Sequence, residues 1–249
     1  YITCMEIKTY GNQQREGFSR KEDENFFAFS NGIFHFVDGK PQFDPTDEIG
    51  VVMHNGKNYY LPAYSKIYAG LNQDSDKYES IRTLVYNEIP LEKQCTFERW
   101  EELMDKVYSI NNNGKWAVLY AVMCAFSSNI HCINRLFTAL FFMGPMMSGK
   151  TQIAISIRSL FISPKVPIFN LNTGTYAALS SLMSSIRDVP VVLDEYNNKD
   201  ISDQAFQLLK GIVYDGDGRQ KRKGTSGREI ETEKVYAPVV LSGQETPQR

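Results

Sequence analysis

The segment Gly144–Thr151 constrains this chain more than any other stretch, because it fits the pattern G-x-x-x-x-G-K-[ST] at every fixed position. Residues 136–143 before it form an almost unbroken apolar run, which is typical of a strand buried on both faces of a parallel sheet. After it, Ile153, Ile157 and Leu160 recur at helical spacing. The sequence therefore predicts a glycine-rich turn from a buried strand into a helix, where main-chain N–H groups and the positive helix end attract phosphate.

The fixed positions of this loop each have a chemical role in binding a nucleoside triphosphate. Gly144 and Gly149 permit backbone conformations that a β-carbon would obstruct. Lys150 is predicted to bridge the β and γ phosphates, and the Thr151 hydroxyl to ligate Mg²⁺. The alternative is an ordinary glycine turn beside a surface lysine, which the strand–loop–helix order disfavours. We expect ATP and Mg²⁺ as ligands, with nucleotide contacts from Gly144, Pro145, Met146, Met147, Ser148, Gly149, Lys150, Thr151 and Gln152.

Composition limits the classes of protein to which the chain can belong. It has 249 residues, of which 42% are hydrophobic, and a formal net charge of −2, so nucleic-acid binding must rest on a local cluster. No apolar run is long enough to span a bilayer and no signal peptide is visible, so we expect a cytoplasmic protein without a membrane partner. The chain lacks an initial methionine and ends just after an apparent core strand, which suggests a fragment of a longer protein.

Cysteines and histidines show no metal-binding pattern in the sequence. Cys4, Cys95, Cys124 and Cys132 form no C-x-x-C pair, which suits reduced thiols. The three histidines, His35, His54 and His131, complete no zinc pattern, so core or surface roles are favoured for them over metal ligation.

The first third of the chain, residues 1–95, is predicted to form a β-rich accessory region. Aromatic runs alternate there with the pairs Asn31-Gly32, Asp38-Gly39 and Asn55-Gly56, which accept the positive φ of tight hairpin turns. We expect several antiparallel strands and a boundary near residue 95.

Two helices are predicted next, at the start of the second region, 96–249. The first begins after Thr96 and the second runs from about 115 to 127. Large apolar residues recur on one side of each helix, and such stripes are usually buried. The stripe of the first helix is Trp100, Leu103, Met104 and Val107, and that of the second is Trp116, Leu119, Tyr120, Met123 and Phe126.

From residue 136 onward strands and helices alternate, which predicts an α/β fold with a parallel sheet. The expected strands are 136–143, 166–171, 189–193 and 237–241, and the expected helices between them are 176–186 and 205–213.

An acidic pair, Asp194-Glu195, follows the third predicted strand. Parallel strands deliver their carboxyl ends to the same edge of a sheet, so this pair should face the glycine-rich loop. Asp194 is predicted to hold Mg²⁺, and Glu195 to orient or deprotonate an attacking water, which favours hydrolysis over phosphoryl transfer. The alternative is an ordinary turn or helix cap.

A basic, glycine-rich segment spans residues 215–228 and contains Arg219, Lys221, Arg222, Lys223 and Arg228. Such a segment can contact a polyanion backbone, with salt-dependent affinity because counterions are released. A solvated basic turn, or contact with nucleotide in a neighbouring subunit, are the alternatives.

Residues 96–249 resemble the ATPase domains of primase-helicases and replication proteins of phages, plasmids and mobile elements, near the superfamily 3 and AAA+ helicases. The resemblance rests on Gly144–Thr151, Val191–Glu195, the basic segment and Val239–Glu245. It implies a P-loop NTPase core of the AAA+/RecA-like kind, a hexameric ring of identical chains, and single-stranded DNA as partner. An arginine finger would be expected about 20 residues past the last strand, beyond this chain's end.

The resemblance also suggests roles for individual residues. In that family, one strand of the sheet lies between the strand that leads into the phosphate loop and the strand that ends in the acidic pair. A polar residue at the tip of this middle strand would sense the γ-phosphate. Gln244 is the first candidate for this catalytic role and Ser242 the second; an ordinary polar strand end is the alternative. The segment before that strand is often a hairpin that grips DNA, which points to Lys221, Arg222 and Lys223, with Arg219 and Arg228 nearby.

Three functions are consistent with these sequence features. The first is a DNA-dependent ATPase motor. The second is a nucleotide-gated binding or assembly switch without motor activity. The third, a small-molecule kinase, is disfavoured by the Asp194-Glu195 pair and by the lack of an obvious acceptor-binding lid.

Overall fold

A computed structural model describes residues 5–7, 26–61, 84–86, 93–162, 168–223 and 229–247. The chain divides into two compact units, Tyr1–Lys93 and Gln94–Arg249, each with its own set of contacts.

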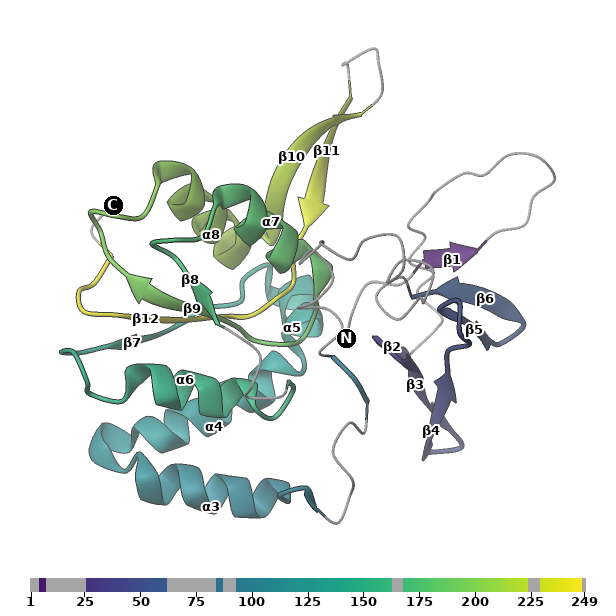
Figure 1. Cartoon of the computed structure of the whole chain (residues 1–249), viewed down its shortest axis with the longest axis horizontal. Coiled ribbons are helices and arrows are strands. Elements are labelled where there is room, and N and C mark those ends of the chain that lie inside the picture. The colour runs from purple at the N-terminus through teal and green to yellow at the C-terminus, as the bar shows by residue number, and fades with distance from the viewer. Residues whose placement is uncertain are drawn as a thin grey trace. The chain divides into compact units, whose positions relative to one another are not determined.

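The described residues of the first unit form two small antiparallel sheets (Figure 1). One sheet has the strand order β2-β3-β4 and the other β1-β6-β5. The bounds are β1 Met5–Ile7, β2 Phe26–Phe29, β3 Gly32–Val37, β4 Lys40–Pro45, β5 Val51–His54 and β6 Lys57–Tyr60.

Two of the three predicted hairpin turns have the expected geometry. Asp38 and Gly39 have φ values of 51° and 74°, and Asn55 and Gly56 have values of 49° and 73°. The third differs, because Gly32 already belongs to β3. A β-carbon at Gly32 would lie 2.2 Å from the carbonyl oxygen of Asp44, so the close approach of β4 is what requires glycine there.

The second unit is built on a four-stranded parallel sheet with the order β7-β12-β9-β8. Helices α6, α4 and α3 lie on one side of the sheet, and α7 and α8 on the other (Figure 1). The strands are β7 Leu140–Met143, β8 Phe169–Asn170, β9 Val191–Tyr196, β10 Asp217–Lys223, β11 Glu229–Lys234 and β12 Val239–Gly243. The helices are α3 Phe97–Val107, η4 Ile110–Asn112, α4 Asn113–Cys124, α5 Ser127–Asn134, α6 Lys150–Arg158, α7 Tyr176–Ser185 and α8 Asp203–Asp215.

The predicted elements of this unit exist, but several bounds were wrong. The first strand begins at Leu140 rather than 136, because a connecting segment follows α5, a helix that the sequence pattern did not predict. The strand expected over 166–171 is assigned only at Phe169–Asn170, and residues 163–167 lie outside the described part. Strands β9 and β12 each extend past their predicted ends and carry polar residues into the sheet edge.

The expected burial of large side chains on the second helix, α4, was also wrong. Trp116 is 61% exposed and Leu119 56% exposed. Small residues face the neighbouring helices instead: a β-carbon at Gly114 would lie 2.1 Å from the Met104 carbonyl oxygen of α3. Close packing of α4 against α3 and α6 therefore selects small side chains, and only Tyr120 among the predicted stripe is buried. The buried residues of α4 are Gly114, Ala117, Tyr120, Ala121 and Cys124.

A membrane-spanning segment was not expected, and within the described residues no single helix is both long and apolar enough to cross a bilayer. The helices spanning Ile110–Cys124 and Ser127–Asn134 together meet the length and composition criteria, but they are bent by 79°. Cys95, which is exposed, and Cys124, which is buried, are free thiols.

Candidate active site

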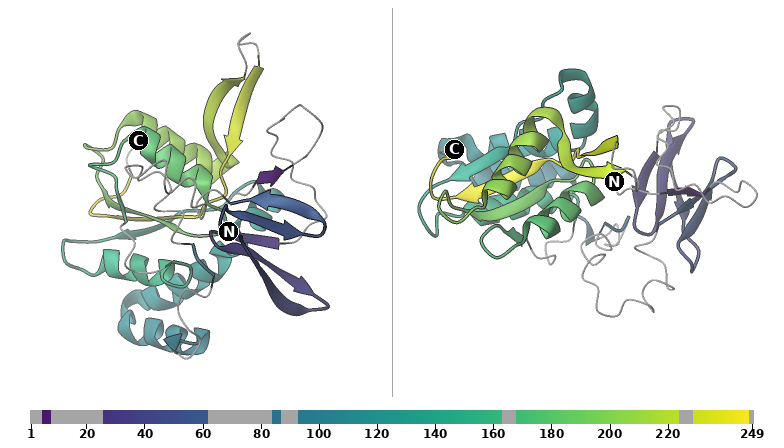
Figure 2. Two further views of the ribbon diagram at one scale, coloured as in Figure 1. Left: turned by 45° about the vertical axis from the view of Figure 1, so that its right-hand side comes forward. Right: turned by 90° about the horizontal axis from the view of Figure 1, so that it is seen from above.

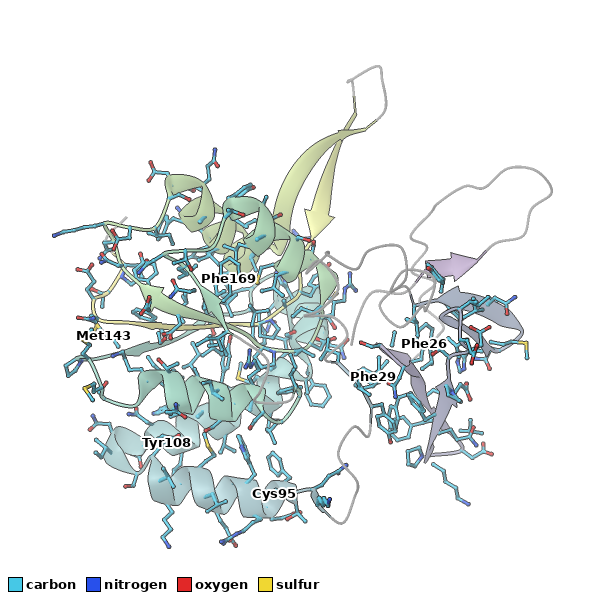
Figure 3. The ribbon with its side chains drawn as sticks, in the orientation of Figure 1. Phe26, Phe29, Cys95, Tyr108, Met143 and Phe169 are labelled. Atoms are coloured by element: carbon cyan, nitrogen blue, oxygen red, sulfur yellow. The ribbon has the colours of Figure 1, made fainter. Side chains whose placement is uncertain are left out.

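The glycine-rich loop connects β7 to α6 at the carboxyl edge of the parallel sheet. Figure 3 labels Met143, the last residue of β7, at this edge. Gly149 has φ 85° and precedes the first residue of α6, so the chain enters the helix through a left-handed conformation that glycine adopts without strain. Met147 also has a positive φ, 60°, and its side chain is fully exposed. The loop therefore has the predicted strand–turn–helix setting.

Lys150 folds back onto the loop that precedes it. Its Nζ donates to the carbonyl oxygens of Gly144 (2.9 Å) and Pro145 (2.6 Å), and lies 3.4 Å from Ser148 Oγ. The ammonium thus occupies the concave side of the loop, where a phosphate group would sit. Binding of a phosphate requires Lys150 to exchange these carbonyls for phosphate oxygens.

Asp194 is the centre of the polar network at this edge. The Thr151 hydroxyl lies 3.2 Å from both Asp194 carboxylate oxygens, although 43 residues separate the two in the chain. The Ser242 hydroxyl of β12 and the backbone N–H of Glu195 (2.9 Å) both donate to Asp194 Oδ1. Three elements, α6, β9 and β12, therefore converge on one half-buried carboxylate.

The pair Thr151 and Asp194 fits the requirements of a Mg²⁺ ion. Magnesium takes oxygen ligands at roughly 2.0–2.1 Å in an octahedron, so two neighbouring ligand oxygens lie about 2.9 Å apart. The observed 3.2 Å between the Thr151 and Asp194 oxygens is close to that spacing. A hydroxyl and a carboxylate, with phosphate oxygens and water completing the shell, are the donors that this ion prefers.

Glu195 is exposed and has an unusual backbone conformation for a strand residue, with φ 61°. The left-handed conformation turns its side chain away from the regular alternation of β9. Its Oε2 accepts a hydrogen bond of 2.6 Å from the Asn170 amide at the end of β8. The carboxylate is thus held at the sheet edge beside Asp194, and a polar partner from a neighbouring strand positions it.

The two candidate sensor residues, Gln244 and Ser242, differ in burial and contacts. Gln244 is exposed and follows β12, whereas Ser242 is buried and bonds directly to Asp194. Asn170 was not predicted at all. The available signal was weak: Asn170 is the second-last residue of the predicted strand 166–171, and strands of a parallel sheet end at one edge. At the same edge, the backbone N–H of Asn198 donates a hydrogen bond to Glu245 Oε1 (3.1 Å).

The basic segment forms part of an antiparallel hairpin, β10–β11, that extends beyond the α/β layers (Figures 1 and 2). The backbone of Arg219, Lys221, Arg222 and Lys223 lies on β10, and Arg228 lies outside the described residues. The pairing register places Glu231 opposite Lys221 and Glu229 opposite Lys223. The two strands together carry five basic and four acidic residues, so the hairpin is less basic than the first strand alone suggests.

Comparison with known proteins adds little to this geometry. No protein-family model matches the chain, and no curated protein matches it. A solved structure described as the active helicase Cch of SCCmec type IV is similar, with 16% sequence identity and a TM-score of 0.42. The similarity covers 92% of this chain and 56% of that one, so the chain spans about half the length of the helicase structure. A similarity this weak assigns neither a fold nor an activity by itself.

Proposed function

We propose that the second unit binds and hydrolyses Mg-ATP and serves as the motor domain of a DNA helicase or primase-helicase. The observation that carries this proposal is the convergence of Thr151, Asp194 and Ser242 beside the loop Gly144–Thr151. A phosphate-binding loop and an opposing carboxylate at one sheet edge are the two parts that nucleotide hydrolysis needs.

The residues of the loop would bind the triphosphate. Main-chain N–H groups of the turn and the first turn of α6 would donate to phosphate oxygens, and Lys150 would move from the Gly144 and Pro145 carbonyls to the β and γ phosphates. Thr151 and Asp194 would hold Mg²⁺, which neutralises phosphate charge when bound. Ser242 would keep the Asp194 carboxylate oriented.

Glu195 would act as the general base that accepts a proton from the attacking water. Its carboxylate is exposed at the sheet edge, where a water molecule has access. The hydrogen bond from Asn170 would fix the direction of this carboxylate in the absence of nucleotide. Gln244, one residue past β12, is proposed to contact the γ-phosphate.

Single-stranded DNA is the proposed partner of the hairpin β10–β11, and identical copies arranged as a ring are the proposed assembly. The supporting feature is the placement of Arg219, Lys221, Arg222 and Lys223 on a hairpin that projects from the core. Four acidic residues on the same two strands reduce the electrostatic attraction, so we expect moderate affinity that weakens steeply with salt.

The proposal is tested by nucleotide binding and hydrolysis. Lys150→Ala should weaken the binding of a fluorescent ATP analogue by about 10- to 150-fold, the value of a lost charged hydrogen bond. Lys106→Ala, which removes an exposed lysine of α3, is the matched control and should bind normally. Equal binding by wild type and Lys150→Ala would refute the assigned nucleotide site.

The motor function is tested separately by measuring ATP hydrolysis with and without single-stranded DNA at two salt concentrations. We expect stimulation that falls at high salt and that decreases when Lys221, Arg222 and Lys223 are all changed to Glu. Hydrolysis that is indifferent to DNA would refute the motor. Nucleotide-dependent assembly without hydrolysis would support the switch instead.

A further inference from the structure

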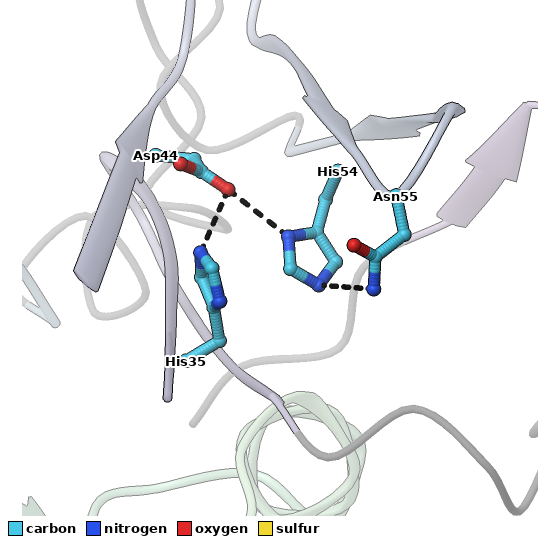
Figure 4. A network of polar contacts seen from close by, with 4 residues as sticks. All are labelled: His35, Asp44, His54 and Asn55. Carbon is cyan, nitrogen blue, oxygen red and sulfur yellow. Dashed lines mark hydrogen bonds and ion pairs between the residues drawn. The ribbon is translucent and has the colours of Figure 1, made fainter. Parts of the chain in front are cut away.

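We infer that His35, Asp44 and His54 of the first unit form a binding site for a zinc ion. One ligand atom from each residue lies within 4.8 Å of the others. Asp44 Oδ2 is 3.0 Å from His35 Nε2 and 3.0 Å from His54 Nδ1 (Figure 4). Zinc at roughly 2.0–2.2 Å from such ligands would hold neighbouring ligand atoms about 3.3 Å apart, so only small shifts are needed.

The fold brings these three residues together from three strands and both small sheets. His35 lies on β3 and Asp44 on β4, where they occupy diagonal positions on one face because His35 pairs with Gln42 and Ile33 pairs with Asp44. His54 ends β5 in the other sheet. A bound ion would therefore tie the two sheets to each other.

The contacts of the two imidazoles leave the Nε2 atom of His35 available as a ligand for a metal ion. The Nε2 atom of His35 is buried and makes no hydrogen bond of acceptable geometry, although Asp44 Oδ2 is 3.0 Å away. His54 Nδ1 faces the same carboxylate oxygen. The two ring nitrogens and the carboxylate oxygen that both of them face make up a two-histidine, one-carboxylate ligand set for a metal ion.

An outer contact supports His54 as a ligand. Its second ring nitrogen, Nε2, lies 3.2 Å from the side-chain amide of Asn55. With a metal on Nδ1, the Nε2–H group would donate to the amide oxygen of Asn55, since the amide oxygen and nitrogen are interchangeable by a flip. Metal-binding histidines generally donate their other ring N–H to such a partner, which fixes the ring orientation.

Packing holds the rings in place while one side of the site stays accessible. The Phe26 ring contacts His54 edge-on with a centroid distance of 5.4 Å, and the two histidine rings are 4.3 Å apart. His35 and His54 are buried, whereas the Asp44 side chain is 36% exposed. An ion can therefore enter beside Asp44, and a water molecule can supply the fourth ligand.

Zinc is the ion that best matches this donor set. Two neutral imidazoles and one carboxylate suit Zn²⁺, whereas Mg²⁺ and Ca²⁺ prefer oxygen ligands alone. A unit of this size has a small core, and a metal that joins its two sheets would add stability that the apolar contacts alone do not provide.

The test uses the whole chain, stripped of metal with a chelator and then titrated with Zn²⁺ or with Co²⁺ as a spectroscopic probe. We expect one tight equivalent, tetrahedral visible absorption for Co²⁺, and a higher melting temperature with Zn²⁺. His54→Gln and Asp44→Asn should each lower the affinity at least tenfold and abolish the cobalt spectrum. His131→Gln changes the histidine outside the cluster and should retain both signals.

Circular dichroism of each metal-free variant shows whether it folds like the metal-free wild type. If His54→Gln or Asp44→Asn fails this comparison, Asn55→Ala serves as a milder variant, with an expected loss of about 10- to 100-fold in affinity. Absence of tight binding by the wild type would overturn the inference. Undiminished binding by His54→Gln and Asp44→Asn would overturn it as well, because the ion would then reside elsewhere.

Discussion

The two edges of the parallel sheet carry polar networks of different character. At the carboxyl edge, Thr151, Asp194 and Glu195 are exposed or half-buried and face solvent. At the amino edge, Asp188 is buried and accepts bonds from Ser128 N (2.6 Å) and Ser128 Oγ (2.8 Å). The first network is open to solvent, whereas Asp188 is buried, so we propose chemistry for the carboxyl edge and a stabilising role for the amino edge.

The amino edge is closed by contacts between helices and the starts of strands. The Ser127 hydroxyl donates to Asp188 Oδ1 (2.9 Å) at the beginning of α5. The Tyr120 hydroxyl of α4 donates to the Val239 carbonyl oxygen (2.8 Å) at the beginning of β12. Burial, and to a lesser extent the neighbouring Cys124 thiol, raises the pKa of Tyr120 well above its ordinary value, so the phenol stays a donor. The polar groups of Ser127, Ser128, Tyr120 and Asp188 are therefore hydrogen-bonded within the protein.

The largest effect is expected for Glu195→Gln at the carboxyl edge. Loss of the proposed general base should lower the rate of ATP hydrolysis by about 10²- to 10⁴-fold, while ATP affinity and the melting temperature change little. The check is a steady-state ATPase assay beside thermal unfolding. Glu245→Gln alters another carboxylate at the same edge and should hydrolyse ATP normally. A Glu195→Gln protein with full activity would remove Glu195 from the mechanism.

The opposite pattern is expected for Asp188→Ala at the amino edge. The change strands the buried N–H and hydroxyl donors of Ser128, whereas the Ser127 hydroxyl can still donate to the Tyr236 carbonyl oxygen (2.8 Å). The free energy of unfolding should therefore fall by about 2–4 kcal/mol. Chemical denaturation measures this loss. The exposed Asp200→Ala is the control and should cost less than about 0.5 kcal/mol. If Asp188→Ala unfolds at the wild-type denaturant concentration, the contacts of Asp188 do not stabilise this edge.

The smallest effect is a dependence of stability on alkaline pH. Burial, followed by the charge of Asp188, raises the pKa of the Cys124 thiol in the folded state. The thiol therefore ionises at lower pH in the unfolded chain, where its pKa has the ordinary value of about 8.5. The contribution of the neutral buried thiol to the free energy of unfolding is fully present below that pH and declines above it. Between pH 9 and 10, the free energy of unfolding of the wild type should fall more steeply than that of Cys124→Ala, by up to about 1.4 kcal/mol per pH unit. The exposed thiol variant Cys132→Ala should follow the wild-type curve, and identical curves for Cys124→Ala and wild type would contradict the assignment.

Much of the second unit was predictable because its signals are local. The residue types of Gly144–Thr151 by themselves predicted the turn, and the apolar runs predicted the parallel strands. Side-chain burial on α4 was not predictable from spacing, because large and small apolar residues alternate around that helix. Which of them faces α3 and α6 depends on how closely the helices approach, and Gly114 lies at a close approach to α3.

Contacts between distant residues account for the rest of the differences. Asn170 and Glu195 meet because β8 lies beside β9, and Ser242 reaches Asp194 because β12 lies between β7 and β9. His35, Asp44 and His54 show no metal-ligand spacing, since each comes from a different strand. The sequence pattern counted the basic residues of β10 but not the glutamates that pairing with β11 brings opposite them.

The order of residues alone determined the glycine-rich turn, the acidic pair and the alternation of strands with helices, because each depends on neighbours within a few residues. Tertiary structure decided the partners of Asp194 and Glu195, the exposed face of α4 and the meeting of two histidines with Asp44. Strand order and helix packing set those distances, and both arise from contacts between segments far apart along the chain.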